Sequence, residues 1–69
     1  MGRLLSKLFT PMRFKTGDTV FLSKEIKITD TILPYHSKVE ITFVDPIMRT
    51  YDILYNGVEY TDFSDSDFE

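Results

Sequence analysis

The chain has 69 residues, no cysteine, a single histidine and a formal net charge of −3. This length allows one small domain, and the composition excludes disulfide bonds, thiolate metal sites and histidine-rich metal sites. Six phenylalanines, four tyrosines and a hydrophobic fraction of 42% are typical of a folded globular protein. A domain of this size has a marginal core, so we expect a protein partner or self-association to add stability.

Residues 1–12 predict a short amphipathic helix or arm. Their apolar residues recur at the spacing of one helix face, and Pro11 predicts that the helix ends just before it. A helix of about two turns is unstable alone in water, so it must dock on the rest of the chain, on a protein or on a membrane surface. The predicted partner-binding residues of this arm are Leu4, Leu5, Leu8 and Phe9.

The first residues also match a lipidation pattern. Gly2 and Ser6 have the spacing of an N-myristoylation acceptor, and a lipid chain beside Arg3 and Lys7 would supply two membrane-binding signals. The pattern is short and arises often by chance, and no apolar run approaches the roughly 18 residues that span a bilayer. We therefore favour a docking helix and do not expect a membrane partner.

From Phe14 onward the hydrophobic period changes to that of strands. The stretches "DTVFLS", "EIKITD" and "KVEITFVD" alternate apolar and polar residues. In the third stretch, Val39, Ile41 and Phe43 are predicted to share one face. "TILPYHS" is interrupted by Pro34 and predicts a loop or an interrupted edge strand.

Turn signals separate these stretches. Gly17 is suited to a positive φ just before the first strand, and the Asp18 side chain can hydrogen-bond its own turn. "DPIMR" predicts a turn, and Asn56-Gly57 predicts a two-residue type I′ turn between two long strands. The last residues, "SDSDFE", predict one helical turn or a final short strand.

The arrangement of these turns and strands resembles the small SH3-like barrels of the Tudor and KOW kind. The resemblance covers residues 13–69 and implies an all-β, five-stranded, partly open barrel that follows the arm and ends in an acidic tail. Small phage-encoded proteins often have this pattern, which implies a phage origin. The residues that carry it are Phe14, Gly17, Asp18 and Val20; Val44 and Asp45; Tyr51, Ile53, Tyr55 and Gly57; and Phe68.

The resemblance also implies an aromatic binding surface. Tudor-type barrels bind methylated lysine or arginine in aromatic cages because a cation is attracted to π faces. The matching residues are Phe21, Tyr51, Tyr55 and Tyr60, with Asp62 as a charge partner. Among binding uses, peptide binding of another kind is favoured over the cage, and the alternative to any binding is that these aromatics pack the two faces of the barrel.

Charge is distributed unevenly along the chain. The acids Asp62, Asp65, Asp67 and Glu69 are interpreted as a solvated tail, in preference to a metal site or a mimic of DNA phosphates. The negative net charge disfavours nucleic-acid binding, which remains the alternative function. Its phosphate contacts would be Arg3, Lys7, Arg13 and Lys15, with Lys24 as a further candidate.

No catalytic arrangement is recognisable. His36 is the one candidate general base, and it lies in a predicted loop without a recognisable nucleophile. We therefore expect no cofactor, no metal and no enzymatic activity. The predicted function is a protein-binding accessory module, an inhibitor, an adaptor or a minor particle component, in the host cytoplasm or associated with a virion.

Overall fold

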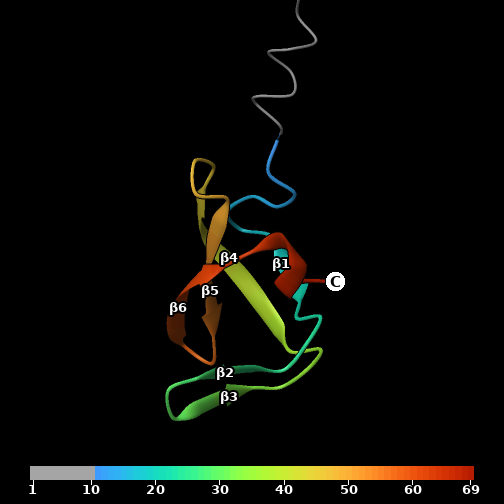
Figure 1. The fold of residues 1–69 in the computed structure, drawn as a ribbon, viewed down its shortest axis with the longest axis vertical. Helices are drawn as coiled ribbons and strands as arrows, with labels where there is room; N and C mark the ends of the chain where they lie inside the picture. The colour runs from blue at the N-terminus through green and yellow to red at the C-terminus, as the bar shows by residue number, and fades with distance from the viewer. Residues whose placement is uncertain (1–10) are drawn as a thin grey trace, which may run out of the picture.

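The computed structural model describes residues 11–69, which form two antiparallel β-sheets and one turn of 3-10 helix (Figure 1). The larger sheet has the strand order β1-β4-β5-β6, and β2 and β3 form a two-stranded sheet. The strands are β1 (Thr19–Phe21), β2 (Ile26–Ile28), β3 (Thr31–Leu33), β4 (Lys38–Asp45), β5 (Thr50–Tyr55) and β6 (Val58–Phe63), followed by the helical turn η1 (Asp65–Asp67). The predicted all-β class is confirmed. Among the described strands, β1 and β6 are the edges of an open sheet and no closed barrel is formed.

Local turn chemistry determines where the strands begin. Gly17 has a φ of +95°, as predicted, and its N–H donates to the Ile41 carbonyl at 2.8 Å. The Asp18 carboxylate accepts from the Lys15 N–H at 3.0 Å, so the Asp18 turn is confirmed as well.

The predicted type I′ turn between β5 and β6 is also confirmed. Asn56 and Gly57 have φ values of +51° and +78°, so both central residues are left-handed as this turn requires. It joins β5 and β6 at the pair Tyr55 and Val58.

The core lies on the inner face of the four-stranded sheet. Alternate residues of β1, β4 and β5 point inward, as the period of two predicts. Leu33 at the end of β3 and Phe68 near the end of the chain complete the cluster. The buried hydrophobic residues are Val20, Leu22, Leu33, Val39, Ile41, Tyr51, Ile53, Phe63 and Phe68.

One strand face differs from the prediction. Val39 and Ile41 are buried, but Phe43 is 54% exposed. A β-bulge between Ile41 and Phe43 shifts the register against β5, so Val44 packs on the core and Phe43 turns outward. The prediction that Phe43 shares the buried face was therefore wrong.

The C-terminal residues are folded onto the sheet, so the interpretation as a solvated tail was wrong. Phe68 is buried and forms an isolated antiparallel bridge with Leu22. The Glu69 N–H donates to the Phe21 carbonyl at 2.9 Å, and the Ser23 N–H donates to the Asp67 carbonyl at 2.8 Å. Figure 1 shows this red segment beside β1. The predicted helical turn is confirmed, since η1 immediately precedes Phe68.

Two further predictions concern the remaining segments. Thr31–Leu33 forms the short strand β3, and Pro34 follows it directly, so the alternative of an interrupted edge strand was right. The predicted arm lies outside the described residues except for residues 11 and 12, which are not helical. Within residues 11–69, no helix is long and apolar enough to cross a membrane.

Candidate functional site

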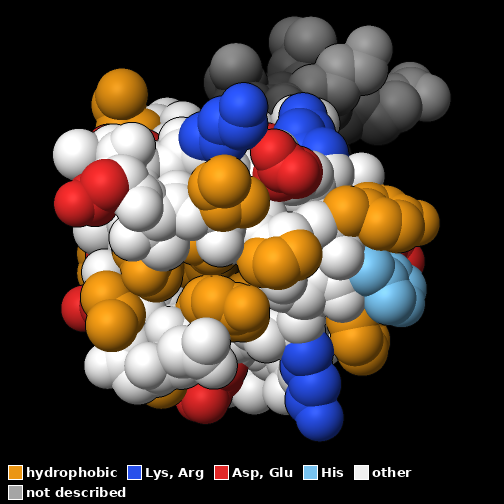
Figure 2. Space-filling view, turned by 90° about the horizontal axis from the view of Figure 1, so that it is seen from below, with side chains coloured by type: hydrophobic (Ala, Val, Ile, Leu, Met, Phe, Trp, Pro, Cys, Tyr) orange, Lys and Arg blue, Asp and Glu red, His pale blue; other side chains and the backbone are white. Residues whose placement is uncertain are grey.

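Three exposed rings on the surface beside β1 form what we call the aromatic stack: Phe21, Tyr35 and His36. The Phe21 and His36 rings are stacked, with centroids 5.0 Å apart and planes 22° apart. The Tyr35 ring lies 5.5 Å from the His36 ring, tilted by 39°. Phe21 is 39% exposed and Tyr35 is 65% exposed. In Figure 2 the single histidine lies at the surface with hydrophobic side chains on either side of it.

The backbone holds the aromatic stack in place. Phe21 points outward because its neighbours Val20 and Leu22 are inward-facing core residues. The His36 N–H donates to the Leu22 carbonyl at 3.0 Å, and the Leu22 N–H donates to the Ser37 carbonyl at 3.0 Å. His36 has a φ of +68°, a left-handed conformation that costs about 1–2 kcal/mol for a residue with a Cβ. These hydrogen bonds help to keep the residue in that conformation.

The C-terminal segment supports the same rings. The His36 Nδ1 lies 2.5 Å from a Glu69 carboxylate oxygen. Because the Glu69 N–H also donates to the Phe21 carbonyl, one residue contacts both stacked partners. The stack therefore presents apolar ring surface whose position is fixed by two segments far apart in the sequence.

The predicted aromatic surface is not assembled as expected. Tyr51 is a core residue with 0% exposure, so its assignment as a partner-binding residue was wrong. Tyr55 and Tyr60 are half-buried and pack against the core, whereas Phe21 is exposed on β1. Of the four predicted aromatics, Phe21 alone contributes to the aromatic stack.

Tyr51 instead joins three parts of the chain. Its hydroxyl accepts from the N–H groups of Arg13 at 3.1 Å and Phe14 at 3.3 Å. The same hydroxyl donates to the Asp65 carboxylate at 2.5 Å. Burial, followed by the hydrogen bond to Asp65, raises the pKa of Tyr51 above its usual value. The residue is a structural link between the start of the described chain, β5 and η1.

The predicted phosphate contacts, which we call the basic stripe, are Arg3, Lys7, Arg13, Lys15 and Lys24. Arg3 and Lys7 lie outside residues 11–69. The Arg13 guanidinium donates to the main-chain oxygens of Asp65, Phe68 and Glu69. Lys24 lies 3.5 Å from an Asp67 carboxylate oxygen, and Lys15 lies 3.9 Å from that of Asp18. Arg13 thus has backbone acceptors, and Lys15 and Lys24 each form an ion pair within the molecule.

Two residues of the aromatic stack, Tyr35 and His36, were not predicted to bind a partner. The sequence predicts a loop at Tyr35 and only a candidate general base at His36. The only available signal was their position directly after Pro34, where a surface connection was expected. The arm residues Leu4, Leu5, Leu8 and Phe9 lie outside the described residues.

Within residues 11–69, no group of histidine, aspartate and glutamate side chains is arranged to hold a metal ion. No protein-family model, no curated protein and no solved structure matches the chain.

Proposed function

We propose that the chain is a non-enzymatic, phage-encoded accessory module that binds a host or phage protein. The aromatic stack is the observation that carries this proposal. Phenylalanine and tyrosine are enriched in the centres of protein interfaces, because each buries a large apolar area. Rings already held by the backbone lose little conformational entropy on binding, so more of the gain from burial contributes to affinity.

The arm provides the second part of the proposed interface. Leu4, Leu5, Leu8 and Phe9 give it apolar side chains, and a short amphipathic segment gains stability by docking on another surface. Such a partner also compensates for a small core, since nine buried hydrophobic residues support the described chain. We place the protein in the host cytoplasm or in a virus particle, as an inhibitor, an adaptor or a minor component.

The fold class that we propose is an SH3-like, partly open barrel. The strand order β1-β4-β5-β6 supports this assignment, and so does the bridge between Leu22 and Phe68, which brings the chain's end back to the segment after β1. A nucleic-acid-binding role would require Arg13 and Lys24 to exchange their present acceptors for phosphates.

A pull-down with mass spectrometry tests this function, using three chains in parallel. The chains are the intact protein, one that lacks residues 1–12, and the double variant F21S/Y35S. Because Phe21 and Tyr35 are exposed, we expect the double variant to keep its fold, which circular dichroism checks. A partner captured by the intact chain and lost with F21S/Y35S supports the proposal, and its loss with the truncated chain adds the arm to the interface. Equal capture by the intact chain and F21S/Y35S, or no capture at all, would overturn it.

A further inference from the structure

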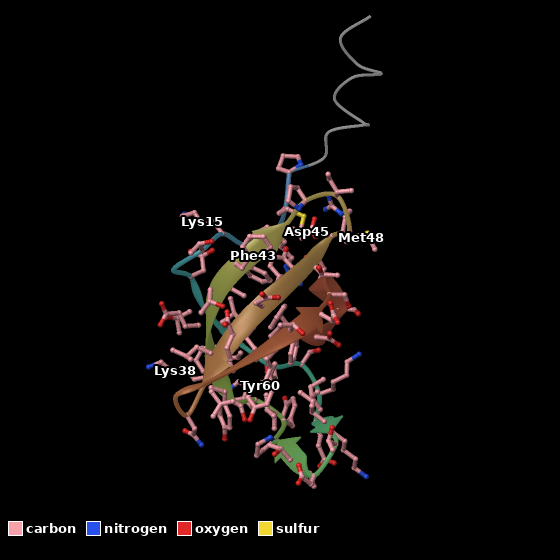
Figure 3. The ribbon with its side chains drawn as sticks, turned by 90° about the vertical axis from the view of Figure 1, so that its left-hand side faces the viewer. Lys15, Lys38, Phe43, Asp45, Met48 and Tyr60 are labelled. Carbon is pink, nitrogen blue, oxygen red and sulfur yellow. The ribbon has the colours of Figure 1, made fainter. Side chains whose placement is uncertain are left out.

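The outward side of β4, β5 and β6 forms a second surface, which we call the outer sheet face. Residues directly opposite each other on neighbouring strands point to the same side. One row across the face is Glu40, Leu54 and Glu59, and the next contains Phe43 opposite Asp52. Figure 3 views the molecule from this side, with Phe43 and Asp45 near one end and Lys38 near the other.

This face carries apolar side chains that the core does not use. Phe43 is 54% exposed and Leu54 is 36% exposed. Phe43 is turned outward by the bulge in the β4–β5 ladder, and a second register shift occurs between Tyr51 and Ile53 in the β5–β6 ladder. Asp52 on β5 therefore lies beside an irregularity in its pairing with β4 and another in its pairing with β6. Bulges of this kind often redirect side chains near functional sites.

The same face is acidic. Burial first, and then repulsion from the carboxylates of Glu59 and Asp62, raises the pKa of Asp52 above its usual value. Thr42 Oγ1 donates to Glu59 at 2.7 Å, which orients this carboxylate without neutralising it. The ion pairs described within residues 11–69 involve other acids, namely Asp18, Asp65, Asp67 and Glu69.

We propose that the outer sheet face binds a segment of another protein that carries lysine or arginine between apolar side chains. Cations of the segment would neutralise the carboxylates of Asp52, Glu59 and Asp62, while its apolar side chains cover Phe43 and Leu54. A second copy of this face carries the same carboxylates and repels it, and the phosphates of a nucleic acid are repelled in the same way. Charge complementarity therefore selects a basic polypeptide.

Phe21 faces the same outward side of the sheet but lies on the edge strand β1, which β4 separates from β5 and β6. The aromatic stack and the outer sheet face therefore use different strands. The proposal extends the proposed function by naming the chemistry of a partner, yet it does not require the stack or the arm. The two proposals can therefore fail separately.

The probe is a displayed library of random 12-residue peptides, selected against the intact chain. We expect the enriched peptides to contain an excess of lysine, arginine and apolar residues. A synthetic copy of the most enriched peptide is then titrated, by fluorescence anisotropy, against the intact chain and its variants.

The test variant is D52N/E59Q/D62N, which removes three charges and keeps the shape of the side chains. Asparagine also tolerates the φ of +69° at position 62. The matched control is E25Q/D30N, which neutralises two exposed carboxylates at either end of β2, away from the face. We expect the triple variant to bind about tenfold more weakly, and the control to change affinity by less than about twofold.

Several results would overturn the proposal. These are a library that yields no binders, binders without an excess of basic residues, or equal affinity for the triple variant and the intact chain. Binding that appears only after removal of residues 1–12 would also contradict it, because the chain's own arm would then be the occupant. The F21S/Y35S variant should bind the peptide normally, which separates this test from that of the aromatic stack.

Discussion

Replacing Tyr51 with phenylalanine removes one hydroxyl group that connects three segments of the chain. The hydroxyl accepts from the N–H groups of Arg13 and Phe14 and donates to the Asp65 carboxylate. The ring itself is fully buried and remains in place in the variant. The substitution therefore tests the hydrogen bonds separately from the packing.

The expected loss follows from those three bonds. A typical hydrogen bond contributes about 0.5–1.5 kcal/mol net, and one to a charged group contributes about 1.5–3 kcal/mol. Because the three bonds share one oxygen and the Asp65 side chain is partly exposed, we expect a total loss of about 2 kcal/mol in the free energy of unfolding. For a domain of this size, that lowers Tm by about 8–16 °C.

Urea denaturation of the intact chain, Y51F and the control Y60F measures this loss. Tyr60 is half-buried and packs against the core, but no hydrogen bond of its hydroxyl is described within residues 11–69, so Y60F should change stability by less than about 0.5 kcal/mol. A Y51F variant as stable as Y60F would refute the structural role assigned to the Tyr51 hydroxyl.

Three further predictions concern the strands and turns. Phe43→Thr should change the free energy of unfolding by less than about 0.5 kcal/mol, as measured with urea, because Phe43 is exposed; a loss of about 3–5 kcal/mol would show that it belongs to the core. Gly57→Ala should destabilise the protein by about 1–2 kcal/mol in the same assay, because its φ of +78° strains a residue with a Cβ. No atom lies within 4 Å of the added methyl group, so a steric clash does not contribute, and an unchanged midpoint would contradict this strain. Asp52→Asn should raise stability at pH 7, because a pKa raised by folding means that the ionised side chain is disfavoured in the native state. That gain should disappear as the pH falls below the ordinary pKa of 3.8, where the carboxyl is protonated in both states, and a gain that persists in acid would exclude this cause.

Local signals predicted the parts of the fold that are determined locally. Gly17 and the Asn56-Gly57 pair need left-handed backbone, which few residues adopt easily, so their turns could be read directly from sequence. The alternation in β1 and in the first half of β4 likewise predicted the buried Val20, Val39 and Ile41.

The differences arise where distant segments meet. Nothing local to "KVEITFVD" signals the bulge that turns Phe43 outward, since the bulge depends on the pairing with β5. Phe68 is buried because it reaches Leu22 across the molecule, so an acidic composition alone gave the wrong interpretation of the C-terminal segment.

The contacts of the candidate site could not be predicted from the sequence for the same reason, because they join distant segments. Tyr51 was predicted as a surface aromatic, but its hydroxyl finds partners at Arg13, Phe14 and Asp65, which only the folded chain brings together. The aromatic stack forms because the segment after Pro34 pairs with Leu22. No spacing in the sequence predicts that contact.

Site-specific photo-crosslinking shows whether the aromatic stack contacts another protein. Tyr35 is replaced by p-benzoylphenylalanine in the full chain, which is expressed in the host cells and irradiated. The control carries the same residue at Asp30, which lies in the exposed turn between β2 and β3. We predict that the variant with the probe at position 35 forms one covalent adduct with a single protein, and that the control does not. No adduct at position 35, or the same adducts from both positions, would contradict the claim that the aromatic stack is a protein-binding surface.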